Sequence, residues 1–162
     1  TTFHKVLLAL SVAALALFTS AALAEDAPSL RIVWPVDGMT VPLGSDIEGV
    51  IGVVVESNFR LAPAGSCGDD PRCGHVHMRI DPRSDDCNIP GRNYNSMNSD
   101  FGGRLIIARF GHCSDRTGEH VVGVLLANDH HQPILVDGQP VTALVQVTTG
   151  DTENERRGRD AA

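Results

Sequence analysis

Apolar and polar residues alternate over short stretches along most of the chain, a pattern typical of β-strands with one buried face. Residues 47–55 (IEGVIGVVV) are rich in β-branched side chains, and their two glycines oppose a stable helix. Residues 74–81 (GHVHMRID) alternate most cleanly: Val76, Met78 and Ile80 share one face. The opposite face carries His75, His77, Arg79 and Asp81. Further short strands are expected at 30–34, 39–43, 58–62, 104–110, 120–127 and 141–148.

Turns and loops separate these strands. Residues 82–103 contain Pro, Gly, Asn and Ser with little periodicity, which indicates a long loop. No helical period is visible after residue 24. About seven or eight short strands predict an all-β fold, an antiparallel immunoglobulin-like (Ig-like) β-sandwich, with a small closed β-barrel as the alternative. Trp34 precedes every cysteine, so the Cys–Trp–Cys order of antibody domains is absent and the likeness is one of architecture.

The amino-terminal segment 1–24 is typical of a signal peptide. Lys5 supplies a positive start, residues 6–18 form an apolar run, and Ala22-Leu23-Ala24 is a small-x-small cleavage site. The apolar run is shorter than the roughly 20 residues of a membrane-spanning helix. The alternative is a short buried helix. The pattern favours export, with Glu25 as the first residue of the mature chain.

Removal of this segment leaves a β-sandwich domain over 25–150 and a flexible polar tail over 151–162. The net charge of −7 and the pI near 5.3 argue against a general nucleic-acid binder, which needs a basic face. Lys5 is the only lysine, so the mature chain has none, and Schiff-base chemistry is excluded. We expect a periplasmic or secreted protein that does not insert into the membrane once the signal is removed.

Four cysteines remain in the mature chain, an even number that predicts disulfides in an exported protein. The favoured pairs are Cys67–Cys73, which closes a short turn, and Cys87–Cys113, which ties the ends of a long loop. The second pair restricts the unfolded chain by roughly 3–4 kcal/mol on the loop-entropy model. The alternative is a thiolate metal site, which the lack of any C-x-x-C pair disfavours.

Histidines carry the candidate chemistry. His75 and His77 lie on the same strand face, about 6.6–6.8 Å apart, so both imidazoles reach a single ion. Neutral imidazole suits Zn and Cu. We predict a metal site from this pair and one histidine of a later segment, of which His120 opens a strand while His130 and His131 lie in the loop after it. A nearby carboxylate as a further ligand or imidazole partner is available from Asp81, Glu119 or Asp129.

The alternative is that these histidines only hydrogen-bond backbone or carboxylate groups. His112, between Gly111 and Cys113, fits that role best. No G-x-S-x-G or H-E-x-x-H motif occurs, and the Asp pairs at 69–70 and 85–86 lack calcium-loop spacing. No catalytic residue is predicted.

Five segments along the chain combine Gly, Pro, Asp and His in a fixed order. They are WPVDGMTV (34–41), NFRLAPAG (58–65), GHVHMRID (74–81), GEHVV (118–122) and NDHHQP (128–133). Their order and phasing resemble a bacterial exported family of unknown function with the pattern S-P-x-D-G-A-x-V, F-x-L-x-P-A-G, G-H-H-H-L-x-I-D, P-G-x-H-T-L and D-x-x-H-x-P.

This resemblance spans roughly residues 30–148 and implies an Ig-like fold whose clustered histidines suggest a metal. The positions of the family's histidines correspond in this chain to His75, His77, His120 and either His130 or His131. The chain departs from the family pattern at Val76, where the family has a middle histidine. It also inserts the Cys67–Cys73 segment before the motif and the long cysteine-flanked loop after it.

A looser similarity is to copper/zinc superoxide dismutase, whose β-barrel uses an H-V-H pair as copper ligands. His75-Val76-His77 matches that pair. The zinc-loop His and Asp series is missing between residues 82 and 111, so the mechanism of that enzyme is not expected.

Three hypotheses follow. The first is an exported β-sandwich that binds Cu or Zn through His75, His77 and His120, with His130 or His131 as alternatives to the last. It serves in metal handling or as a binding module rather than in turnover. The second is a structural or adhesion module of the cell envelope, with a protein partner and no metal. The third is a metal-dependent redox enzyme.

Overall fold

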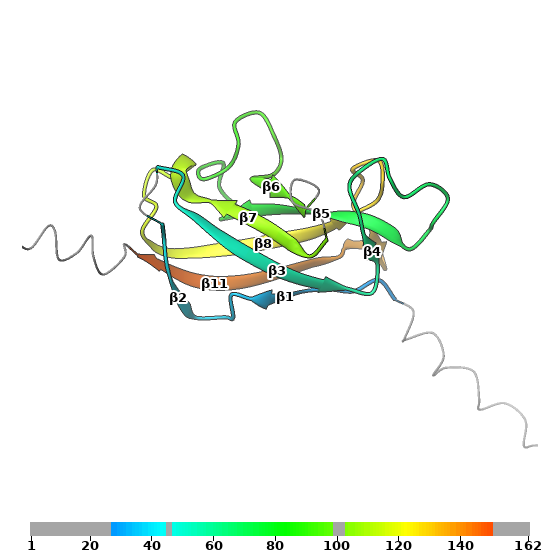
Figure 1. The fold of residues 1–162 in the computed structure, drawn as a ribbon, viewed down its shortest axis with the longest axis horizontal. Coiled ribbons are helices and arrows are strands. Elements are labelled where there is room, and N and C mark those ends of the chain that lie inside the picture. Colours follow the sequence, from blue (N-terminus) through cyan, green and yellow to red (C-terminus); the bar gives the residue numbers. More distant parts are fainter. Residues whose placement is uncertain (1–26, 45–46, 99–102, 151–162) are drawn as a thin grey trace, which may run out of the picture.

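Two β-sheets pack face to face and form the body of the molecule (Figure 1). The computed structural model describes residues 27–44, 47–98 and 103–150. The smaller sheet has the order β1-β3-β7, and both neighbouring pairs are antiparallel. Its strands are β1 (Leu30–Trp34), β3 (Val50–Ser57) and β7 (Leu105–Arg109).

The larger sheet has the order β2-β11-β8-β5-β4, and β6 also pairs with β5. The β11–β8, β8–β5 and β5–β6 pairs are antiparallel, whereas β2 runs parallel to β11 and β4 parallel to β5. The bounds are β2 (Met39–Pro42), β4 (Arg60–Leu61), β5 (Cys73–Ile80), β6 (Ser96–Met97), β8 (Gly118–Ala127) and β11 (Thr142–Gly150).

The predicted all-β fold of about seven or eight strands is confirmed, and its packed sheets fit the predicted sandwich as well as the alternative small barrel. Seven strands have four or more residues, and the amino-terminal strands β1 and β2 lie in different sheets. Four two-residue strands complete the set, among them the hairpin of β9 (Leu135–Val136) and β10 (Gln139–Pro140). A short 3₁₀ turn, η2 (Phe110–His112), follows β7.

The core lies between the two sheets and follows the alternation seen in the sequence. On β5 the apolar face, Val76, Met78 and Ile80, is at most 1% exposed. Alternate residues of β8 lie beside this face in the same sheet, and alternate residues of β3 pack on it from the opposite sheet. Each fully buried aliphatic side chain contributes about 1.5–3 kcal/mol to the free energy of unfolding. This packing fixes which face of β5 points outward, and the histidines lie on that outward face.

Several local predictions change in detail. The strand expected at 58–62 shrinks to β4, and the loop expected at 82–103 contains β6, because its Ser96 and Met97 pair with β5. Segments 1–24 and 151–162 lie outside the described residues, so the signal peptide and the tail stay predictions. Within the described ranges, no helix has the length and hydropathy needed to cross a membrane.

The structure contains both predicted disulfides, Cys67–Cys73 and Cys87–Cys113. All four cysteines are therefore oxidised, which fits an oxidising, exported environment. The first disulfide closes the loop between β4 and β5. The second joins the loop after β5 to the residue after η2.

Candidate metal centre

The strand β5 brings His75 and His77 to the outward face of the larger sheet. In its pairing with β8, His75 lies opposite Ala127 and His77 opposite Leu125. His75 is fully buried although it lies on this outer face, whereas His77 is half-buried. The chain must therefore cover His75 from outside the sheet.

The loop after β8 supplies part of that cover, because it folds back towards β5. The Asn128 backbone N–H donates to the Gln132 carbonyl at 2.8 Å, and the Asn128 side-chain oxygen accepts from the His130 and Gln132 N–H groups. His131 has a positive φ of 63°, which turns the chain sharply at this residue. These contacts bring the His131 ring to the pair on β5.

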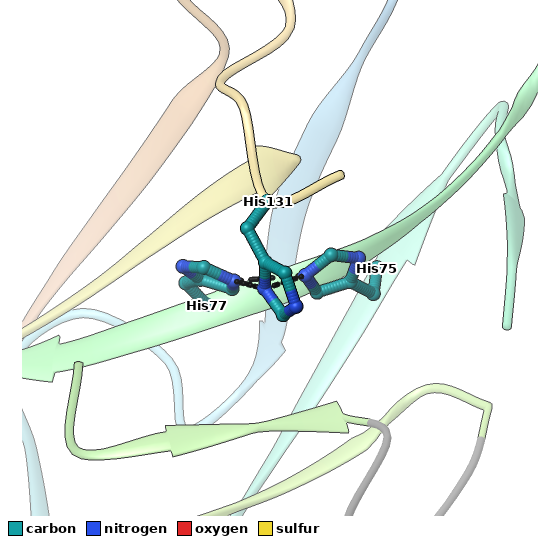
Figure 2. A group of neighbouring side chains, drawn as sticks. All are labelled: His75, His77 and His131. Atoms are coloured by element: carbon teal, nitrogen blue, oxygen red, sulfur yellow. Dashed lines mark hydrogen bonds between the residues drawn. The ribbon is translucent and has the colours of Figure 1, made fainter. Parts of the chain in front are cut away.

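Three ring nitrogens converge at this point, as Figure 2 shows. His75 Nε2 is 2.8 Å from His77 Nε2 and 3.1 Å from His131 Nδ1. The third separation, from His77 Nε2 to His131 Nδ1, is 3.2 Å. Each residue thus presents one ligand atom to a shared point.

The triangle of nitrogens has the size of a metal site. An ion about 2.0–2.1 Å from each nitrogen in a tetrahedral arrangement holds the nitrogens about 3.3 Å apart. Two of the three observed separations are within a few tenths of an ångström of that value, and the third is shorter. Three nitrogen ligands leave one coordination position for a ligand from outside.

Burial keeps the imidazoles on β5 neutral, which is the form that binds metals. Burial, and then the neighbouring charges of His75 and His131, lower the pKa of His77 to about 4. The pKa of His75 is also lowered, first by burial and then by His131, and the Asp129 carboxylate partly offsets this shift. The metal-binding form of this pair therefore persists into mildly acidic solution.

Two further contacts hold the surroundings of the cluster in place. The Asp129 carboxylate accepts hydrogen bonds from the Gly65 and Cys67 backbone N–H groups, at 2.7 and 3.3 Å. This joins the histidine loop to the loop closed by the first disulfide, and the two loops lie side by side in Figure 1. On the other side, the Tyr94 ring lies 5.1 Å from the His77 ring.

The structure brings together three of the predicted ligands, His75, His77 and His131. His120, the first choice for the third ligand, does not reach this cluster in the structure. Because β8 is antiparallel to β5, the start of β8 lies beside the end of β5, and His120 Nδ1 is 2.8 Å from the Asp81 carboxylate instead.

The remaining candidates lie outside the cluster. His130 is exposed, and of the two adjacent loop histidines only His131 belongs to the group of converging ligand atoms. Glu119 is exposed on β8. Asp129 binds backbone N–H groups rather than an imidazole.

Sequence reasoning missed two neighbours of His77. Met97 on β6 lies directly opposite His77, and facing residues of an antiparallel pair project to the same side of the sheet. Tyr94 is the second. Residues 82–103 show little periodicity, so the sequence predicts no register that would place either residue.

No protein-family model and no curated protein matches this chain. The motif resemblance to the exported family and the H-V-H similarity to superoxide dismutase therefore stay predictions. Any statement about function depends on the geometry of the three histidines.

The low pKa of His77 has a measurable consequence in the metal-free protein. We expect its ring resonances to stay constant from pH 8 to pH 5.5 and to move near pH 4. In the urea-unfolded chain the same ring should titrate near its ordinary value of about 6.5. Proton NMR titration of the two states checks this, and a folded-state midpoint near 6.5 would contradict the burial argument.

The same shift predicts how stability depends on pH. Between about pH 6.5 and pH 4, His77 is protonated in the unfolded chain but stays neutral in the folded chain. Protons therefore favour the unfolded state in this range. The contribution of His77 to the free energy of unfolding is therefore complete above pH 6.5 and is lost as the pH falls towards 4.

Proposed function

We propose that this chain is an exported β-sandwich that binds one copper or zinc ion through His75, His77 and His131, for metal handling or as a binding module. The observation that carries the proposal is the convergence of three ring nitrogens within 3.2 Å of one another. Neutral imidazoles at this separation form at most a few hydrogen bonds among themselves, whereas one ion satisfies all three lone pairs.

The donor set favours copper and zinc over harder cations. All three ligand atoms are imidazole nitrogens, which suit Zn and Cu, whereas Mg and Ca prefer oxygen ligands. Met97 lies directly opposite His77 in the β5–β6 pair, and thioethers favour Cu(I). The two disulfides fit a protein that meets its metal outside the cytoplasm.

Metal uptake by the purified protein tests the proposal. After removal of metals, the wild-type chain is dialysed against Cu²⁺ or Zn²⁺, and bound metal is measured by elemental analysis. We expect one ion per chain. His77→Ala should weaken binding by at least about 100-fold, because even loss of a second-shell partner costs 10–100-fold.

His130→Ala is the matched control, since it removes an exposed imidazole next to His131 without touching the cluster. This variant should bind metal like the wild type. Absence of stoichiometric uptake, or equal uptake by His77→Ala, rejects the proposal. If, in addition, neither a chelator nor added metal changed the stability of the protein, the result would favour a structural or adhesion module of the cell envelope.

A further inference from the structure

A further imidazole, outside the three-histidine cluster, is placed like a metal ligand at the other end of the β5–β8 pair. His120 is only 7% exposed, and its Nδ1 is 2.8 Å from the Asp81 carboxylate. Its other ring nitrogen, Nε2, is buried and has no hydrogen-bond partner among the described residues. A carboxylate that fixes one imidazole nitrogen and leaves the other free is the usual second-shell arrangement of a histidine ligand.

The sulfur atoms of the second disulfide lie next to this imidazole. One ligand atom each from Cys87, Cys113 and His120 fall within 4.8 Å of one another. Cys87 is 1% exposed, whereas Cys113 is partly exposed and offers a reductant access to the disulfide. In the oxidised protein both sulfurs are occupied by their mutual bond, so this group holds no metal.

Hydrogen bonds independent of the disulfide hold the two cysteine segments together. The Asp86 carboxylate accepts from the Ser114 N–H and hydroxyl at 2.9–3.2 Å, one residue away from each cysteine. The Asn95 side-chain amide donates to the Cys87 carbonyl at 2.6 Å and to the Arg109 carbonyl, and its oxygen accepts from the Arg109 N–H. Reduction therefore leaves the two sulfurs close to each other.

We propose that reduction of Cys87–Cys113 opens a second metal site, in which the two thiolates and His120 bind a thiolate-preferring divalent ion such as Zn²⁺. A dithiol supplies two electrons and two protons, the S–S bond breaks into two thiols, and the dithiol closes to its own disulfide. Metal binding then releases the two thiol protons. In a tetrahedral zinc site the two sulfurs separate to about 3.8 Å, a small movement from bonded contact.

Asp81 acts as a positioning residue for this site. Its Oδ1 accepts from the Val121 N–H at 2.8 Å, so the carboxylate is anchored to β8 while its Oδ2 holds the ring of His120. Asp81 also has a positive φ of 47°, which asparagine tolerates well. Asp81→Asn thus removes the charge with little disturbance to the backbone.

Metal counting before and after reduction tests the proposal. The protein is treated with excess dithiothreitol, freed of reductant under argon and titrated with Zn²⁺, with Co²⁺ as a spectroscopic probe. We expect reduction to add one ion per chain and to produce a thiolate-to-cobalt charge-transfer band. The same gain should appear in the His77→Ala background, which separates this site from the three-histidine cluster.

Four variants test the assignment of the ligands. Cys67→Ser/Cys73→Ser should keep the gain, because it removes only the other disulfide. Cys87→Ser/Cys113→Ser should abolish it, and Asp81→Asn should weaken Zn²⁺ binding by about 10–100-fold while the cobalt band persists. The proposal is overturned if the folded chain resists reduction at these cysteines, if no further ion is bound, or if His120→Ala binds that ion as tightly as the wild type.

Discussion

Saturation with Cu²⁺ or Zn²⁺ is expected to raise the free energy of unfolding of the wild-type chain by about 4 kcal/mol at a free metal concentration of 1,000 times Kd. The reason is mass action, since the converging nitrogens of His75, His77 and His131 exist together only in the folded chain. His75 and His77 share one strand, but His131 is separated from them by more than fifty residues. The unfolded chain therefore offers at most a weak two-histidine site.

Thermal unfolding with and without metal measures this effect. For a domain of this size, 1 kcal/mol shifts Tm by at least about 2 °C, so we expect a rise of at least about 8 °C. His131→Ala should lose most of the rise, and His130→Ala should keep it. An equal shift in both variants would show that the ion binds elsewhere, and a chelator should reverse the wild-type shift completely.

The alternation of residues 74–81 predicts two of the three ligands of the candidate site. It placed His75 and His77 on one face and three core residues on the other, and the structure has both faces as predicted. Burial of His75 was not predictable from this pattern. It depends on the loop from Asn128 to Gln132, whose cover over β5 arises from contacts between segments distant in sequence.

Strand register decides which of the later histidines reaches the cluster. The sequence indicated that the strand containing His120 neighbours β5, but not which end of it lies near His75. In the antiparallel pair, His75 faces Ala127, the last residue of β8, so the residues that follow β8 reach the cluster and the residues that begin it do not. An assumption of antiparallel pairing would have favoured His130 or His131.

A short hairpin follows the histidine loop. Asp137 and Gly138 both have positive φ, at 50° and 77°, and connect β9 to β10 as a two-residue turn. Asp-Gly is a strong hairpin signal because it tolerates this geometry. The strands on either side have only two residues each, which explains why no alternation was visible there.

Among the substitutions, Gly74→Ala is expected to have the largest effect on the stability of the metal-free protein. A Cβ at position 74 would lie 2.3 Å from the Ala127 carbonyl oxygen and 3.3 Å from its carbon, and both are backbone atoms that cannot rotate away. The strands β5 and β8 must therefore separate next to His75. Overpacking of this kind costs roughly 1–3 kcal/mol, and the upper end applies because the clash is with a paired strand.

The matched control is Gly150→Ala, since nothing lies within 4 Å of a Cβ at that position in β11. That variant should be unchanged or more stable by up to about 1 kcal/mol, because alanine restricts the unfolded chain. Urea unfolding of the metal-free proteins measures both changes. Gly74→Ala should also weaken metal binding, since the displaced carbonyl belongs to the residue from which the His131 loop departs. If Gly74→Ala were as stable as the wild type and bound metal with the same affinity, the close approach of β5 to the Ala127 carbonyl would be contradicted.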